Sequence, residues 1–228
     1  MGELIEFPAN GHTCSGYLAV PPGGQGPGLV VIQEWWGLVD HITGLCDRFA
    51  GEGFVALAPD LYQGTQAKSP DEAGKLFMAL NIAKASADLR GAADALTHRR
   101  EVEPRKIGVV GFCMGGQLAL YGATEHPDRF ACAVNFYGVH PKVEIEPSRV
   151  KVPILAHFGT RDTSTPESVA RPLIEQIRGA GANIEAHFYD AGHAFFNDTR
   201  PAAYDEASAT LAWIRTLAFL RQHLIGSP

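Results

Sequence analysis

The stretch VVGFCMGGQLALY, residues 109–121, places a thiol where it could attack a carbonyl group. Apolar residues typical of a buried strand precede Cys113, Gly111 and Gly115 flank it, and a helical pattern follows from Gln117. This order of strand, sharp turn and helix is that of the G-x-S-x-G nucleophile elbow, with cysteine in place of serine. Glycines are needed because a side chain beside so tight a turn would collide with neighbouring elements. The stretch predicts a thiol nucleophile; the alternative is a buried structural cysteine.

An aspartate and a histidine follow Cys113 in the order that a catalytic triad on such an elbow requires. Asp162 comes shortly after the apolar run Val152–Phe158, and His193 follows the run that ends at Tyr189. Both residues are therefore predicted on loops at the ends of strands. We expect His193 to act as the general base and Asp162 to hold its ring in the right tautomer.

Asp190 is the alternative acid, because it lies closer to His193 in the sequence. An aspartate in the same tight turn usually bonds its own backbone, as in an Asx-turn, so we favour Asp162.

Composition and charge indicate a protein that acts on a small molecule. The 228 residues are 46% hydrophobic without a break in composition, which predicts one domain over residues 1–228. The net charge is −6 and the positive residues are scattered, so we expect no nucleic-acid or membrane partner.

The absence of export and metal signals completes this expectation. The N-terminus has no signal-peptide pattern, no apolar run is long enough to span a bilayer, and the four cysteines show no C-x-x-C spacing. Reduced thiols in a cytoplasm are the simplest interpretation, and we favour a monomer. No H-x-x-x-H motif or cysteine cluster suggests a zinc site, so we expect neither a metal nor another cofactor.

Short apolar or alternating runs recur along the chain and predict the strands of an α/β fold. The runs are 29–33, 55–58, 106–112, 131–136, 152–158 and 183–189. Each is followed by a helical pattern or a glycine-rich turn, which is typical of a mostly parallel sheet with helices on both faces.

The N-terminal part differs from this pattern. Runs 4–7 and 12–20 flank the turn signal Asn10-Gly11 and predict an antiparallel hairpin, and 21–28 predicts a loop. Farther on, the start signals Ser69-Pro70-Asp71-Glu72 and Thr165-Pro166-Glu167 each predict a helix.

Six short blocks, in order along nearly the whole chain, resemble the dienelactone hydrolase family, also called carboxymethylenebutenolidases. The blocks are Gln33–Gly37 (QEWWG), Ala58–Tyr62 (APDLY), Gly111–Gly116 (GFCMGG), Phe136–Gly138 (FYG), Gly159–Asp162 (GTRD) and Ala191–Phe195 (AGHAF). The resemblance implies an α/β-hydrolase fold without a large lid. It also implies a Cys-His-Asp triad that opens lactone or other ester bonds through an acyl-enzyme.

The same resemblance gives Glu34 a role. A free thiol titrates near pH 8.5, so only a small part of it is thiolate at neutral pH. In the family the matching glutamate contacts the neutral thiol and accepts its proton when substrate binds. The alternative is that Glu34 only caps a strand end or forms a salt bridge.

Backbone N–H groups and aromatic side chains complete the expected site. We expect the backbone N–H groups of Trp35 and Met114 to form the oxyanion hole. We expect Trp36, Tyr137 and Phe195 to line the substrate pocket.

The sequence departs from the family where a substrate carboxylate would bind. The two arginines expected for that role are absent, both after His193 and after the Asp-Leu-Tyr block. The residues that might take their place are Lys68, Lys75, Lys84 and Arg200. An anionic dienelactone is therefore not assumed as the substrate.

Two further functions stay open beside a cofactor-free cysteine hydrolase. One is a catalytically weak binding module on the same fold, and the other is a redox sensor built on Cys113. A sensor needs a resolving cysteine, for which Cys132 in the next predicted strand is the candidate.

Overall fold

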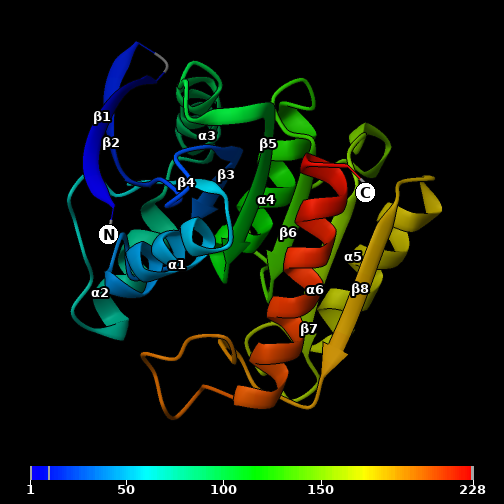
Figure 1. The fold of residues 1–228 in the computed structure, drawn as a ribbon. Coiled ribbons are helices and arrows are strands. Elements are labelled where there is room, and N and C mark those ends of the chain that lie inside the picture. Colours follow the sequence, from blue (N-terminus) through cyan, green and yellow to red (C-terminus); the bar gives the residue numbers. More distant parts are fainter. Residues whose placement is uncertain (1, 10, 227–228) are drawn as a thin grey trace.

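An eight-stranded sheet forms the centre of the protein in a computed structural model, which describes residues 2–9 and 11–226 (Figure 1). The strand order is β1-β2-β4-β3-β5-β6-β7-β8. The strands are β1 (Glu3–Ala9), β2 (His12–Ala19), β3 (Gly26–Ile32), β4 (Val55–Pro59), β5 (Val102–Phe112), β6 (Cys132–Phe136), β7 (Ile154–Gly159) and β8 (Ile184–Tyr189). Strands β3 to β8 pair in parallel, and β2 pairs antiparallel with β1 and with β4. The expected mostly parallel sheet with an antiparallel N-terminal hairpin is confirmed.

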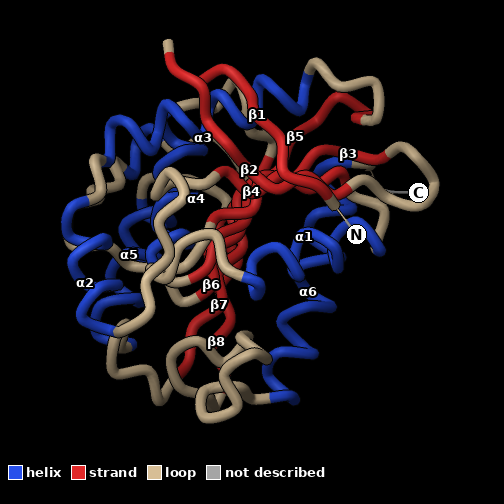
Figure 2. Tube along the Cα trace, turned by 90° about the vertical axis from the view of Figure 1, so that its left-hand side faces the viewer, coloured by secondary structure: helices blue, strands red, loops and turns tan. Residues whose placement is uncertain are grey.

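Helices cover both faces of this sheet (Figure 2). One face packs against α1 (Asp40–Gly51) and α6 (Glu206–Leu224), and the other against α3 (Ile82–Thr97), α4 (Met114–Glu125) and α5 (Glu167–Gly179). Successive residues of β3 serve the two faces in turn, as the strand's period of two requires. Leu29 and Val31 pack in the core under α1 and α6, and Val30 and Ile32 pack in the core under α3, α4 and α5. Two shorter elements, α2 (Pro70–Ala79) and the 3₁₀ turn η1 (Pro147–Arg149), lie in the connections.

The two predicted helix starts have different outcomes. Helix α2 begins at Pro70 as predicted, and the Ser69 hydroxyl caps it by accepting the backbone N–H of Glu72 at 3.3 Å. Helix α5 begins at Glu167, but its capping position is Pro166 and not Thr165. The Thr165 hydroxyl instead donates to the carbonyl of Tyr137 at 3.1 Å, which ties two loops of the site together.

The predicted loop 21–28 is wrong at its end, because Gly26 and Gly28 already belong to β3. Gly26 pairs with Val102, so β5 also begins earlier than predicted. A Cβ at Gly26 would lie 1.9 Å from the carbonyl oxygen of Gly53, so only glycine allows this approach. In the predicted N-terminal turn, Gly11 has φ +81°, whereas Asn10 lies outside the described residues.

The loops that carry the chemistry meet at one edge of the parallel part of the sheet. They follow β3, β5, β6, β7 and β8, and so extend from the carboxyl ends of neighbouring strands. Open α/β sheets bind their ligands at this edge. None of the helices within residues 2–9 and 11–226 is both long and apolar enough to cross a membrane.

Candidate active site

Cys113 occupies a strained turn between β5 and α4. Its φ and ψ are 55° and −125°, a conformation that residues other than glycine rarely adopt and that persists where the surroundings enforce it. A Cβ at Gly111 would lie 1.8 Å from the carbonyl oxygen of Gly115, and one at Gly115 would lie 2.5 Å from that of Gln33. The two flanking glycines are therefore sterically required. The thiol is partly exposed and lies at the N-terminus of α4, whose backbone dipole favours a negative charge on the sulfur.

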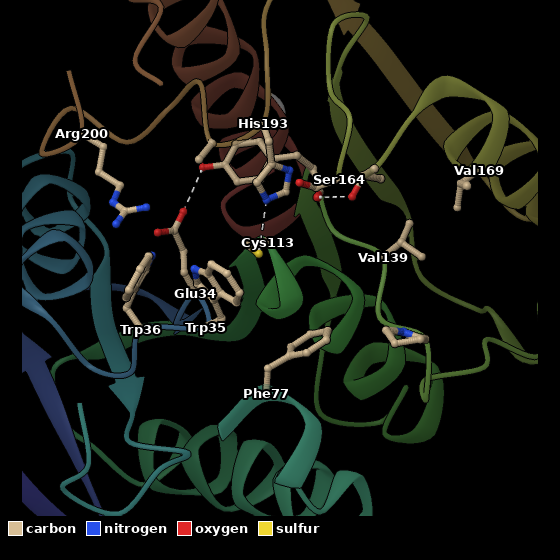
Figure 3. A pocket seen from close by; sticks show the side chains of 14 residues that line it. Glu34, Trp35, Trp36, Phe77, Cys113, Val139, Ser164, Val169, His193 and Arg200 are labelled. Carbon is tan, nitrogen blue, oxygen red and sulfur yellow. Dashed lines mark hydrogen bonds between the residues drawn. The ribbon is translucent and has the colours of Figure 1, made fainter. Parts of the chain in front are cut away.

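Cys113, His193 and Asp162 form a continuous chain of contacts, of which Figure 3 shows the one between His193 and Cys113. The Nε2 atom of His193 lies 3.4 Å from the sulfur of Cys113, and Nδ1 lies 2.7 Å from Oδ2 of Asp162. The other carboxylate oxygen accepts the backbone N–H groups of Ser164 at 2.7 Å and Thr165 at 2.8 Å. These bonds fix the carboxylate so that Oδ2 faces the imidazole.

Asp190, the alternative acid, points away from this chain. Its side chain is 85% exposed, and its carboxylate pairs with the guanidinium of Arg161 at 2.9 Å. The geometry therefore favours Asp162 as the partner of His193.

The electrostatics of the pair stabilise an imidazolium. Burial alone would lower the pKa of His193, but hydrogen bonds to Asp162 and Cys113 outweigh it and raise the pKa from 6.5 to about 10. Burial alone would raise the pKa of Asp162, but the bonds to His193 and to the backbone N–H groups of Thr165 and Ser164 lower it. Each partner thus favours the charged form of the other.

Glu34 lies in the same cleft, on the loop after β3, but makes no hydrogen bond to the sulfur of Cys113. Its carboxylate is buried, and both oxygens are occupied. The Tyr137 hydroxyl donates to Oε1 at 3.4 Å, and the Asn197 amide donates to Oε2 at 2.9 Å. Sequence reasoning assigned no role to Asn197, although it lies only four residues after His193.

The backbone N–H groups of Trp35 and Met114 have no hydrogen-bond acceptor among the described residues. Met114 is the first residue of α4 and Trp35 lies in the loop after β3. Neither backbone N–H donates a hydrogen bond to any other residue that the structure describes. Their positions match the two sources of oxyanion donors that an elbow of this kind uses.

A cleft of about 610 Å³ opens above Cys113. Trp36 and Tyr137, two of the residues predicted for a substrate pocket, line it. Phe195 does not: its side chain is fully buried, and its ring lies 5.4 Å from that of Tyr137 and 5.2 Å from that of Tyr189. The preceding Ala194 has φ +58°, and with the chain turned in this way Phe195 lies in the core while Ala194 lines the cleft.

Of the four cations considered for a substrate carboxylate, only Arg200 lines the cleft. Its guanidinium stacks over the ring of Trp36, 4.0 Å from the centroid. Lys84 instead pairs with Asp88 at 3.7 Å. Lys68 and Lys75 do not line the cleft either, so among the described lining residues no lysine or second arginine can form a clamp with Arg200.

The described residues offer no evident metal site. Across 2–9 and 11–226, no three His, Cys, Asp or Glu side chains are grouped in a way that could hold a metal ion.

Comparison with known proteins defines the class of this fold and site. A crystal structure of a Klebsiella pneumoniae subsp. pneumoniae protein assigned to the dienelactone hydrolases superposes with a TM-score of 0.87 at 30% identity, covering 97% of this chain and 98% of the other. The fold is that of the α/β hydrolases.

The sequence comparisons narrow this class to one family. The model of the dienelactone hydrolase family matches residues 14–224. Protein usf of Aquifex pyrophilus is 38% identical, with 98% of this chain and 100% of the relative covered. A carboxymethylenebutenolidase of a Pseudomonas species is 36% identical, with 90% and 89% covered. The chain belongs to the dienelactone hydrolase family and is a hydrolase of ester or lactone bonds.

Proposed function

We propose that the protein hydrolyses its ester or lactone through a thioester formed on Cys113, with His193 and Asp162 as the other members of the triad. The observation that carries the proposal is the chain of contacts from the sulfur through Nε2 and Nδ1 to the carboxylate, at 3.4 Å and 2.7 Å. The free N–H groups of Trp35 and Met114 support it as oxyanion donors.

The reaction balances with these groups alone. The thiol of Cys113 passes its proton to Nε2 of His193, and the sulfur attacks the carbonyl carbon. The oxyanion of the tetrahedral intermediate accepts the N–H groups of Trp35 and Met114. The intermediate collapses to a thioester as the C–O bond breaks, and His193 gives a proton to the leaving alkoxide. With a lactone, this alcohol stays on the acyl chain. Water then attacks the thioester while His193 takes its proton, which releases the acid and restores the thiol.

The pKa of His193 fits both roles. In the free enzyme the bonds to Asp162 and Cys113 raise the pKa of His193 to about 10, so the ring is ready to give a proton to the leaving group. Acylation removes the negative charge that the sulfur can carry, and with it part of the stabilisation of the imidazolium. The ring then becomes a better base for water in the second half of the reaction.

We propose Glu34 as a second acceptor for the thiol proton. Its place in the cleft supports this role, but its carboxylate must first leave Asn197 to reach the sulfur. His193 is already in contact with the sulfur, so it is the first acceptor by geometry.

The redox alternative is less well supported. Cys132 pairs with Gly108, which precedes Cys113 by five residues, so the two cysteines lie roughly 16 Å apart along the strands. A disulfide needs Cα atoms within about 7 Å. All four cysteines are free, which supports the proposed setting of a one-domain enzyme in a reducing cytoplasm.

Alkylation of the thiol tests the proposal. Turnover of phenyl acetate should fall at least 1,000-fold in Cys113→Ala. Iodoacetamide should inactivate the wild type and the control Cys14→Ala at the same rate. Cys14 is a suitable control because it is a free cysteine on β2, outside the cleft. A Cys113→Ala variant that keeps more than a tenth of the wild-type turnover would contradict the proposal.

A further inference from the structure

The cleft has two unlike ends, with Cys113 between them. Figure 3 shows Arg200, Trp36 and Glu34 on one side of the sulfur, Val139 and Val169 on the other, and Phe77 below it. Apart from Cys113 and His193, two ionisable side chains line the cleft, Glu34 and Arg200. Both lie on the first side. The second side, completed by Phe77 and Pro141, is mostly apolar, with Ser164 between His193 and Val169, and is called the apolar wall below.

The apolar wall is built from three separate parts of the chain. Phe77 comes from α2, Val139 and Pro141 from the connection after β6, and Val169 from the first turn of α5. Side chains that meet from such distant segments make a defined surface and not a local cluster of neighbours in the sequence.

Contacts behind the wall hold it in place. The ring of Phe77 packs on the buried ring of His140, with the centroids 4.2 Å apart. Lys142 donates its ammonium to the carbonyl of Met78, which ties the same connection to α2. The Gln117 amide of α4 donates to the carbonyl of Val143 at 3.0 Å and anchors the connection from below. The wall is therefore already formed in the free enzyme.

This wall nevertheless leaves apolar surface open. Val169 is 43% exposed, and Phe77 and Val139 are only half-buried. Exposed apolar side chains that line a cleft beside a reactive group gain stability when an apolar ligand covers them. The cleft of about 610 Å³ lies in the range of about 300–1,000 Å³ for sites that enclose whole drug-sized ligands, so a bare lactone ring would leave much of it unfilled.

The charged end offers little to an anionic substrate. Arg200 is exposed and stacked on Trp36, and among the described residues that line the cleft no lysine or second arginine joins it to form a clamp. A single exposed ion pair contributes little to binding, since water screens it. Glu34 is a carboxylate on the same side and would oppose another negative charge.

We infer that the natural substrate is a neutral ester or lactone that carries an aromatic or branched apolar group, and that this group binds against Phe77, Val139, Pro141 and Val169. The inference rests on the proposed function, because it takes Cys113 as the point of attack. It assigns the wall as the element that determines specificity, and it places the reacting carbonyl at the sulfur between the two ends.

Two matched lactones test this inference in the wild type. One is a five-membered lactone with a phenyl substituent, and the other is the same ring with a carboxymethyl substituent in the same position. We expect kcat/KM to be at least tenfold higher for the phenyl lactone. Equal values, or a preference for the carboxylate, would overturn the inference.

Variants of the wall locate the effect. Phe77→Ala should raise KM for the phenyl lactone about tenfold with little change in kcat, because the ring contributes binding that is equal in the ground and transition states. Val169→Lys should shift the ratio of kcat/KM at least tenfold toward the carboxymethyl lactone. Ile214→Lys, the same change at a site on α6 that is 58% exposed and outside the cleft, should leave the ratio unchanged.

The outcomes separate this inference from the proposed function. If Phe77→Ala and Val169→Lys treat both lactones as the wild type does, the wall does not bind the substrate, and the inference is wrong while the triad stands. Circular dichroism spectra and thermal midpoints of the variants show that a change in the ratio comes from a folded enzyme. The mechanism is tested separately with Cys113→Ala, which should lose turnover of both lactones to the same extent.

Discussion

Asp162→Asn replaces one oxygen by an NH₂ group and is expected to lower kcat by about 10⁴-fold, as the same change does in a serine protease triad. The structure gives the reason. Oδ1 of Asp162 accepts two backbone N–H groups, from Ser164 and Thr165, so the remaining oxygen of an asparagine must stay on that side. The new NH₂ group then faces Nδ1 of His193 across the present 2.7 Å contact.

This contact forces the wrong tautomer on the imidazole. Nδ1 must accept a hydrogen bond, so the single proton of the neutral ring moves to Nε2, which faces the sulfur of Cys113 at 3.4 Å. An Nε2 that already carries a proton cannot take one from the thiol or from water. A 10⁴-fold loss corresponds to about 5.5 kcal/mol of transition-state stabilisation, at about 1.4 kcal/mol for each factor of ten.

Initial rates on a neutral lactone at pH 7 measure the effect, with Asp190→Asn as the matched control. Asp190 is 85% exposed and bonded to Arg161, so its variant should keep kcat within about twofold of the wild type. The reasoning is refuted if Asp162→Asn loses less than tenfold, or if the two variants lose similar amounts while both remain folded.

Three more variants probe the elbow, Glu34 and the charge of His193. Gly111→Ala should lower the free energy of unfolding in urea by several kcal/mol, because its Cβ would lie 1.8 Å from a carbonyl oxygen. Gly74→Ala in α2 has open space around it and should raise that free energy by about 0.5–1 kcal/mol. Equal effects of the two changes would contradict the steric explanation. Glu34→Gln should keep the fold and deacylation but slow the single-turnover burst, and a burst at the wild-type rate would leave Glu34 a structural role only. The pKa of His193 is raised to about 10 in the folded protein, so its stabilising contribution is complete below pH 6.5 and is lost as the pH rises through 10. The thermal midpoint of the wild type should therefore exceed that of His193→Gln most at pH 6 and least near pH 10.5, and a constant difference would argue against a charged His193.

The parts of the site that lie next to strand ends could be predicted from the sequence. The glycines around Cys113 and the order of Asp162 and His193 are local signals, because a parallel sheet brings the carboxyl ends of its strands to one edge. The strands and the N-terminal hairpin could also be predicted, because apolar or alternating runs and turn residues are local features of the sequence.

Contacts between distant segments could not be predicted in this way. The hydrogen bond from Asn197 to Glu34 joins residues 163 positions apart, and no local pattern in the sequence predicts it. Phe77 belongs to a helix whose start was predicted from Ser69, but its position over the cleft depends on packing against His140. The expectation for Phe195 was wrong because the positive φ of Ala194 redirects the chain, which the residue types alone do not reveal.

A covalent acyl-enzyme on Cys113 can be detected by mass spectrometry. The enzyme is mixed with an activated phenyl ester, quenched in acid during turnover and digested. The peptide containing Cys113 should gain the mass of the acyl group, and neutral hydroxylamine should remove this mass, as it does for a thioester. Cys113→Ala should show neither the adduct nor turnover. An acyl group on another residue, or undiminished turnover in Cys113→Ala, would contradict the account.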